Sequence, residues 1–121
     1  MSSISHVDKF NHNHGFYLWI VTNNKYLDWQ IITLFYSALH LIEEYLIRYE
    51  GQTFKSHIKR HHYLNTSSRI DPGIVSDYLL LYQLSHQSRY QLVSMTQTDL
   101  SNAQNLFGNI MGNMRRLYKV G

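Results

Sequence analysis

Hydrophobic residues recur at steps of three and four along most of the chain, which is the spacing of one face of an α-helix. The first such face carries Val7, Phe10, His14, Tyr17 and Val21. Ser5 precedes this face as a residue type that commonly caps a helix, and Asp8 follows three residues later as its acidic partner. We therefore predict a first helix that begins after Ser5 and ends at the asparagines at positions 23–24.

The most apolar segment of the chain runs from Trp29 to Leu46. Charged residues interrupt it, which is costly within a membrane, so the segment predicts a buried helix and not a membrane span. We expect Asp28 to cap this helix, Gly51 to end it, and Glu44 and Arg48 to pair one turn apart. Such a helix lies at the centre of a bundle or in a subunit interface. Its polar residues form one narrow stripe: Gln30, Thr33, Ser37, His40, Glu44 and Arg48.

Two further helices follow in the middle of the chain. Ser56 is predicted to cap a short helix that ends near Leu64, before a polar loop over residues 65–68. Asp71 and Pro72 then give the clearest start signal in the sequence, because aspartate caps helices and proline suits the first helical position. This next helix carries Ile74, Tyr78, Leu81 and Ser85 on one face and Tyr82, His86 and Arg89 on the adjacent face.

The segment Ser94–Gln97 indicates a break before a last helix, which either Thr98 or Thr96 caps. Gly108 and Gly112 lie inside this helix, where glycine weakens helical structure, and we expect them to allow close approach of a neighbouring helix. The apolar positions of the helix are Leu100, Ala103, Leu106, Phe107, Ile110, Met114 and Leu117.

These elements predict an all-α fold, an up-and-down bundle of four to five helices that forms one domain over residues 1–121. The absence of cysteine excludes disulfides, thiolate zinc sites and a cysteine nucleophile. The formal net charge of +3 permits a nucleic-acid partner without requiring one. No basic stretch leads into an apolar run at the start of the sequence, so we expect no secretory signal, no membrane association and a cytoplasmic location.

The most chemically suggestive segment is the basic stretch Ser56–His62. On a helix, His57 shares a face with Arg60 and with His61. Histidine can act as a general acid or base and arginine can hold a phosphate, so these three residues are our candidates for metal-independent cleavage of a phosphodiester. The neighbouring Lys59 and His62 would add binding contacts. The alternative is a solvated basic face that carries no chemistry.

A second segment repeats the pattern Ser-His-x-x-Arg, with His86 and Arg89 one helical turn apart. The two repeats either converge on one groove or match by chance. His40, on the polar stripe of the apolar helix, is either a hydrogen-bonded core residue or a binding residue, with Glu44 within reach one turn later.

A metal site is not expected. His57 and His61 have the i,i+4 spacing of a helical zinc pair, but no His-Glu-x-x-His motif surrounds them. His40 and Glu43 run in the opposite order to the Glu-x-x-His pair of di-iron bundles. We therefore predict no metal and no cofactor.

The order of several short motifs resembles the HEPN superfamily, in particular small stand-alone prokaryotic HEPN-like proteins. These motifs are Asp28-Trp29-Gln30-Ile31-Ile32, Phe35-Tyr36-Ser37-Ala38-Leu39-His40, Ser56-His57-x-x-Arg60 and Tyr78-x-x-Leu81-x-x-x-Ser85-x-x-x-Arg89-Tyr90. The resemblance implies a four- or five-helix bundle that dimerises. It also implies a setting of RNA-cleaving toxins with antitoxin partners, defence systems and nucleotide-binding modules.

Many active HEPN members carry an arginine that is followed after four to six residues by a histidine. Here Asn65, Thr66 and Ser67 stand at those positions after Arg60. Two hypotheses follow. One is a non-enzymatic module that binds RNA, a nucleotide or a protein partner as a homodimer, with the apolar second helix as its interface. The other is a metal-independent endoribonuclease of toxin or defence type that uses a histidine–arginine pair.

Overall fold

Five helices form the part of the chain that the structure, a computed structural model, describes: residues 5–20, 26–90 and 94–118. They are α1 (His6–Ile20), α2 (Leu27–Glu50), α3 (His57–Thr66), α4 (Pro72–Tyr90) and α5 (Gln97–Tyr118). No strand occurs within these described ranges. The prediction of an all-α bundle is confirmed.

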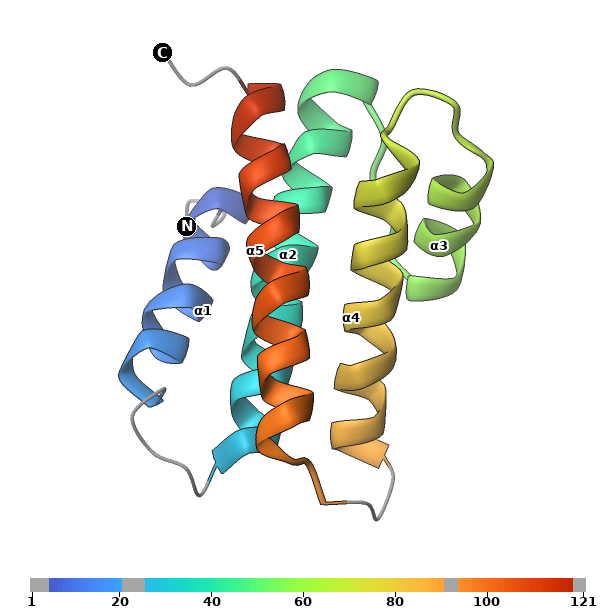
Figure 1. The fold of residues 1–121 in the computed structure, drawn as a ribbon. Helices are drawn as coiled ribbons and strands as arrows, with labels where there is room; N and C mark the ends of the chain where they lie inside the picture. Colours follow the sequence, from blue (N-terminus) through green and yellow to red (C-terminus); the bar gives the residue numbers. More distant parts are fainter. Residues whose placement is uncertain (1–4, 21–25, 91–93, 119–121) are drawn as a thin grey trace.

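The four long helices run alternately up and down, and the short α3 lies beside α4 at the edge of the bundle (Figure 1). The central helix is α2, which contacts α1, α4 and α5. Its fully buried residues include Ile31, Ala38, Ile42 and Leu46, and they pack into one core with residues of the other four helices. The apolar circumference of α2 is therefore explained by its place inside a single chain.

Three of the predicted caps are present at the N-termini of helices. The Ser5 hydroxyl accepts a hydrogen bond at 3.1 Å from the amide three residues later, and Ser56 does the same at 3.2 Å. The Asp71 carboxylate accepts from the amide of Gly73 at 2.7 Å, directly before Pro72 opens α4. Each of these bonds satisfies an amide that the helix itself leaves unpaired.

Two more boundaries follow the expected chemistry. Thr96, and not Thr98, caps α5: its hydroxyl accepts from the amide of Asp99 at 3.1 Å, and the Asp99 carboxylate accepts from the amide of Thr96 at 2.9 Å. This is a reciprocal capping box. Gly51 ends α2 with a φ of 63°, in the left-handed region that glycine adopts without steric cost.

Other boundary predictions are wrong. Asp28 does not cap α2, because the helix already begins at Leu27 and the capping position belongs to Tyr26, whose side chain makes no cap hydrogen bond. Helix α3 continues to Thr66, so the predicted loop over 65–68 is shorter than expected. The asparagines at 23–24, predicted to end α1, lie outside the described residues.

The prediction that Gly108 and Gly112 admit a neighbouring helix is also wrong. A Cβ atom built at either position meets no heavy atom within 4 Å, and both residues are exposed. They lie on the outer face of α5, where their small size is not needed for packing.

The polar stripe of α2 is largely buried, with Gln30 and Ser37 at 0% exposure. Two hydroxyls on it bond to carbonyls one turn earlier in the same helix: Thr33 to Trp29 at 2.6 Å and Ser37 to Thr33 at 2.9 Å. Such bonds let short polar side chains enter a core without other partners. Towards the end of the stripe, the predicted pair between Glu44 and Arg48 is present at 3.1 Å.

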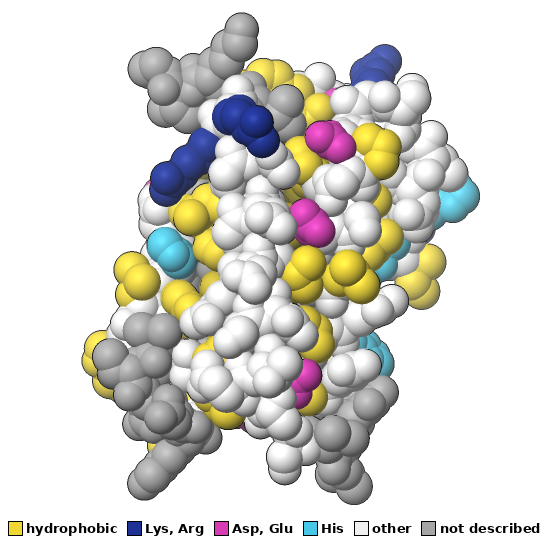
Figure 2. Space-filling view, in the orientation of Figure 1, with side chains coloured by type: hydrophobic (Ala, Val, Ile, Leu, Met, Phe, Trp, Pro, Cys, Tyr) yellow, Lys and Arg dark blue, Asp and Glu magenta, His cyan; other side chains and the backbone are white. Residues whose placement is uncertain are grey.

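The surface in Figure 2 belongs to the side of the bundle where α5 is in front. White atoms of the backbone and of uncharged side chains and yellow hydrophobic atoms dominate this face, basic side chains lie towards its upper end, and histidines appear at its side edges. None of the helices in the described part of the chain is long and apolar enough to cross a membrane.

Candidate functional site

A groove of about 350 Å³ lies where α2, α3 and α4 meet, and we call it the α3–α4 groove. His57 reaches it from the first Ser-His-x-x-Arg repeat, and His86 and Arg89 reach it from the second. The two repeats thus converge on one place in the fold. The lining residues are Phe35, Tyr36, His57, Tyr82, Ser85, His86 and Arg89.

Tyr82 lines this groove, and three imidazole rings lie near its own ring. Its centroid is 5.2 Å from that of His57, 4.5 Å from that of His61 and 5.9 Å from that of His86. Tyr82, His86 and Arg89 succeed one another at steps of four and three on α4, which places them on one helix face. The groove therefore has an aromatic wall with imidazoles on both sides of it.

Arg89 lies at the exposed edge of the groove. Its Nη1 donates to the Tyr36 hydroxyl, and its guanidinium carbon lies 5.6 Å from the centre of the Tyr36 ring. Because Tyr36 belongs to α2 and Arg89 to α4, this contact joins the two helices across the groove. The hydroxyl and the ring of Tyr36 thus contact the cation near the opening of the groove.

Arg60 has a different environment, although the sequence predicts it as the phosphate-holding residue. Its side chain is buried, with 4% of the residue exposed, and it pairs with the carboxylate of Glu43. It also donates to the Phe54 carbonyl at 3.1 Å and contacts His57 Nδ1 at 3.1 Å. Arg60 does not line the α3–α4 groove. Its charge is instead paired with Glu43 inside the protein.

The contact with Arg60 determines how His57 is protonated. A guanidinium can only donate, so Nδ1 of His57 accepts the hydrogen bond. Burial lowers the pKa of His57 below its usual range, and the charges of Arg60 and Arg89 lower it further. The imidazole is therefore neutral near pH 7, and its proton is on Nε2. His57 presents an N–H donor at that nitrogen and not a base.

His61 lies half-buried beside Tyr82, and its Nε2 is buried without a hydrogen-bond partner among the described residues. Burial lowers the pKa of His61 to about 4, helped by the nearby His57 and Arg60. His61 does not line the groove. The remaining basic candidates of α3, Lys59 and His62, are exposed and do not line it either.

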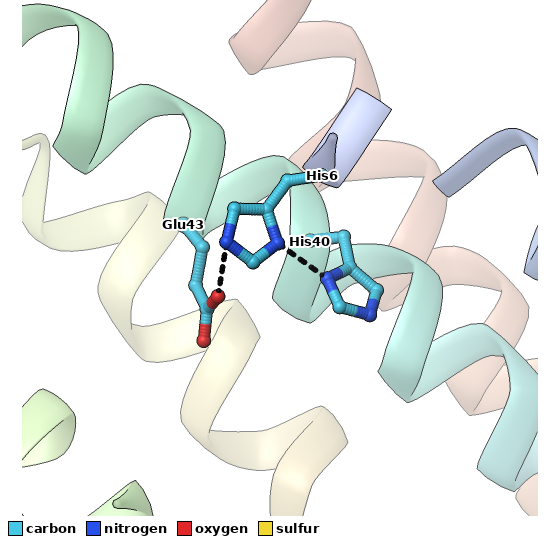
Figure 3. Close-up of side chains that lie close together, drawn as sticks. All are labelled: His6, His40 and Glu43. Atoms are coloured by element: carbon cyan, nitrogen blue, oxygen red, sulfur yellow. Dashed lines mark hydrogen bonds and ion pairs between the residues drawn. The ribbon is translucent and has the colours of Figure 1, made fainter. Parts of the chain in front are cut away.

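His40 lies between α1 and α2, away from these residues. Its partner is His6, at 2.9 Å between the two Nδ1 atoms, and not Glu44, which pairs with Arg48. The other nitrogen of His6, Nε2, lies 2.9 Å from Oε2 of Glu43 (Figure 3). The pKa of His40 is lowered to about 4. Burial is the main cause, and the charges of His6, Lys9 and Arg60 lower it further.

Among the described residues, His6, His40 and Glu43 are the group whose ligand atoms lie close enough to hold a metal ion. His57 and His61, which have zinc-like spacing, are not part of such a group, and the Nδ1 of His57 is already used by Arg60. Sequence reasoning missed His6 because its partners are more than thirty positions away, and no local pattern marks it.

No protein-family model, curated protein or solved structure matches this chain. The resemblance to the HEPN superfamily therefore stays a prediction that depends on the order of the sequence motifs.

Proposed function

We propose that the protein is a non-enzymatic module that binds one nucleotide unit, either free or within single-stranded RNA, in the α3–α4 groove. The observation that carries the proposal is the convergence of His57, His86 and Arg89 on one groove beside tyrosine rings. Nitrogen donors of this kind bind phosphate oxygens, and aromatic rings stack on bases. Together they match the two chemical parts of a nucleotide.

Arg89 is the proposed phosphate contact. A guanidinium has five N–H donors in a planar fork that matches two phosphate oxygens. The bond from Nη1 to the Tyr36 hydroxyl orients this plane at the groove edge. Arg89 is exposed, so its guanidinium is accessible to a ligand from solvent.

His57 supports binding more than catalysis. Its Nδ1 accepts from Arg60, so its Nε2–H can donate to a phosphate or ribose oxygen. The size of the groove supports a small ligand. Its volume of about 350 Å³ is near the lower end of the roughly 300 to 1,000 Å³ of ligand pockets. One nucleotide unit suits such a space better than a duplex.

The test is fluorescence anisotropy with a short labelled oligouridine, with AMP as an unlabelled competitor. We expect Arg89→Ala to weaken binding about tenfold or more, because one charge-assisted hydrogen bond is lost. The matched control is Lys59→Ala, which removes the same charge from an exposed position outside the groove. Equal losses in both variants would show non-specific attraction, and no binding at low salt would leave a protein partner as the function.

A metal-independent endoribonuclease is the second candidate, and the pair of imidazoles in one groove favours it. His86 would take the proton of a ribose 2′-hydroxyl while the 2′-oxygen bonds to phosphorus, and the imidazolium so formed would pass that proton to the departing 5′-oxygen. Neutral His57 would donate its Nε2–H to a phosphate oxygen and so stabilise the transition state. RNA incubated in EDTA with wild type and with His57→Ala/Arg89→Ala separates the candidates: equal background in both removes the enzyme.

The HEPN resemblance adds a homodimer and an antitoxin-like partner to the proposal, and the sequence pattern adds a cytoplasmic location. The middle of α2 is buried within the single chain, so only its ends could contribute to a dimer interface. Exposed hydrophobic side chains lie on α1 and at the ends of α2, including Trp19 at 77% and Trp29 at 54% exposure. Light scattering tests the dimer, and a strict monomer at micromolar concentration would contradict it.

A further inference from the structure

We propose that His6, His40 and Glu43 form a binding site for a divalent transition-metal ion of the zinc class, which joins α1 to α2. The site shares no residue with the α3–α4 groove and does not depend on the function proposed there. It combines one ligand from the start of α1 with two ligands from consecutive turns of α2 (Figure 3).

The donor set matches this class of ion. Two imidazoles and one carboxylate are the protein ligands of many zinc sites that keep an open position. In this chain each of the three residues offers one ligand atom, and these atoms all lie within 4.8 Å of one another. His40 and Glu43 are three positions apart, so they lie on the same side of α2.

The distances require only local adjustment. His6 Nε2 is 2.9 Å from Glu43 Oε2, and His6 Nδ1 is 2.9 Å from His40 Nδ1. Ligand atoms around a tetrahedral zinc ion are about 3.4 Å apart, given metal–nitrogen bonds of about 2.0 to 2.1 Å. The His6–Glu43 contact must therefore widen slightly, and the His40 ring must turn towards it. The side chains of His6 and His40 are both partly exposed, so they can make these movements.

The contacts of the Glu43 carboxylate suit it to serve as a metal ligand. Its Oε1 is held by the guanidinium of Arg60, while its Oε2 faces His6. In established metal sites, residues behind the ligands orient them through hydrogen bonds of this kind. Arg60, from α3, would therefore fix the carboxylate in place without contacting the ion. This gives the buried arginine a positioning role.

The site also has access to solvent. A second groove of about 580 Å³ lies between α1 and α2, and His40 lines it together with Asp8, Lys9, His12 and Asn13. An ion could enter from this side. With three protein ligands, a fourth position would be left for water, as in zinc sites with open coordination.

The test uses the full chain, stripped with EDTA and dialysed, and titrated with zinc chloride by calorimetry. We expect one equivalent to bind with a Kd below about 10 µM. His6→Ala and His40→Ala should each weaken binding at least tenfold. The matched control is His12→Ala, which removes an exposed histidine from the same groove and the same helix. It should change the Kd less than twofold.

A second measurement covers the case in which His40→Ala folds poorly. Zinc should slow amide hydrogen exchange across α1 in wild type, and this protection should be absent in His6→Ala, whose side chain is partly exposed. Arg89→Ala should bind zinc like wild type, which separates this site from the α3–α4 groove. No stoichiometric binding, or equal binding in His6→Ala and His12→Ala, would overturn the proposal and leave His6 as a hydrogen-bonded bridge.

Discussion

The two Ser-His-x-x-Arg repeats have the same spacing but different surroundings. Arg60 is buried against the carboxylate of Glu43, whereas Arg89 is exposed and contacts the hydroxyl and ring of Tyr36. The spacing places each histidine one turn from its arginine in both repeats. What differs is the side chain that α2 presents opposite each helix. One motif therefore gives a structural ion pair on α3 and a candidate ligand contact on α4.

Replacing each arginine in turn tests whether the two repeats differ in their role. Arg60→Ala should lower the free energy of unfolding by about 3 kcal/mol or more, because it removes the guanidinium from Oε1 of the largely buried Glu43 carboxylate and leaves only His6 beside it. Arg89→Ala should lower it by less than about 1 kcal/mol, because its contacts are at the surface. Urea unfolding followed by circular dichroism measures both values. Equal losses would remove the distinction between the repeats.

A double variant identifies the cause of the loss at Arg60. Glu43→Gln removes the charge that loses its guanidinium partner in Arg60→Ala, so the double variant should be more stable than the sum of the single losses predicts. The interaction energy should be about 1 kcal/mol or more for two groups in direct contact. Simple additivity in the same unfolding experiment would mean that Arg60 acts through its aliphatic packing.

The pH dependence of stability tests the surroundings of α3. The pKa of His61 in the folded chain is about 4, below the 6.5 of an exposed histidine, so the unfolded chain takes up the proton first. The contribution of neutral His61 to the free energy of unfolding should therefore be fully present above pH 6.5. It should be lost as the pH drops from 6.5 towards 4. The loss from this residue should be on the order of 1 kcal/mol after allowance for its partial exposure to solvent.

The measurement is the free energy of unfolding at pH 7 and pH 5, in EDTA, for wild type and for His61→Gln. His61 is surrounded by His57 and Arg60 on its own helix and by Tyr78 and Tyr82 of α4. Replacing His61 should reduce the loss of unfolding free energy between pH 7 and pH 5. As the control, His62→Gln on the exposed side of α3 should keep the wild-type slope. The same slope in both variants would assign the decline to other groups.

The serines of the two repeats should give the smallest difference. Ser56→Ala removes the hydrogen bond that caps α3 and should cost about 1 kcal/mol. Ser85 lies inside α4, is buried at 2% exposure and caps no helix. Because alanine favours a helix more than serine does, which offsets part of the lost hydroxyl contact, Ser85→Ala should change stability by less than about 0.5 kcal/mol. Thermal melts of the two variants make the comparison. A larger loss for Ser85→Ala would give its hydroxyl a structural role that its position does not indicate.

The parts of the fold that the sequence predicts well depend on contacts over a few residues. Ser56, Asp71 and Gly51 act within one turn of their own positions, so residue type is enough to place them. Gly108 shows the limit of this approach, because whether a glycine meets a neighbour depends on which face of the helix turns outward. Asp28 shows another limit, because α2 begins before it without any capping side chain.

The candidate sites were predictable only in part. The convergence of the repeats was one of two outcomes that the spacing left open, and the step of four from Tyr82 to His86 already placed these residues on one face. The burial of Arg60 was not predictable, because an arginine in a basic stretch usually faces water. Its partner, Glu43, is seventeen positions away. His6 is separated from His40 by thirty-four positions, and only the packing of α1 on α2 reveals the contact.

The carboxylate of Glu43 has a consequence for how this chain can change by mutation. One of its oxygens is held by Arg60 of α3 and the other by His6 of α1, so a single side chain on the central helix serves both outer helices. A substitution at position 43 alters the environment of positions 6 and 60 together. The effect of a mutation at either of these positions must then depend on the residue at 43. We therefore expect the effects of mutations at positions 6, 43 and 60 to be non-additive, so that substitutions at these three positions occur together.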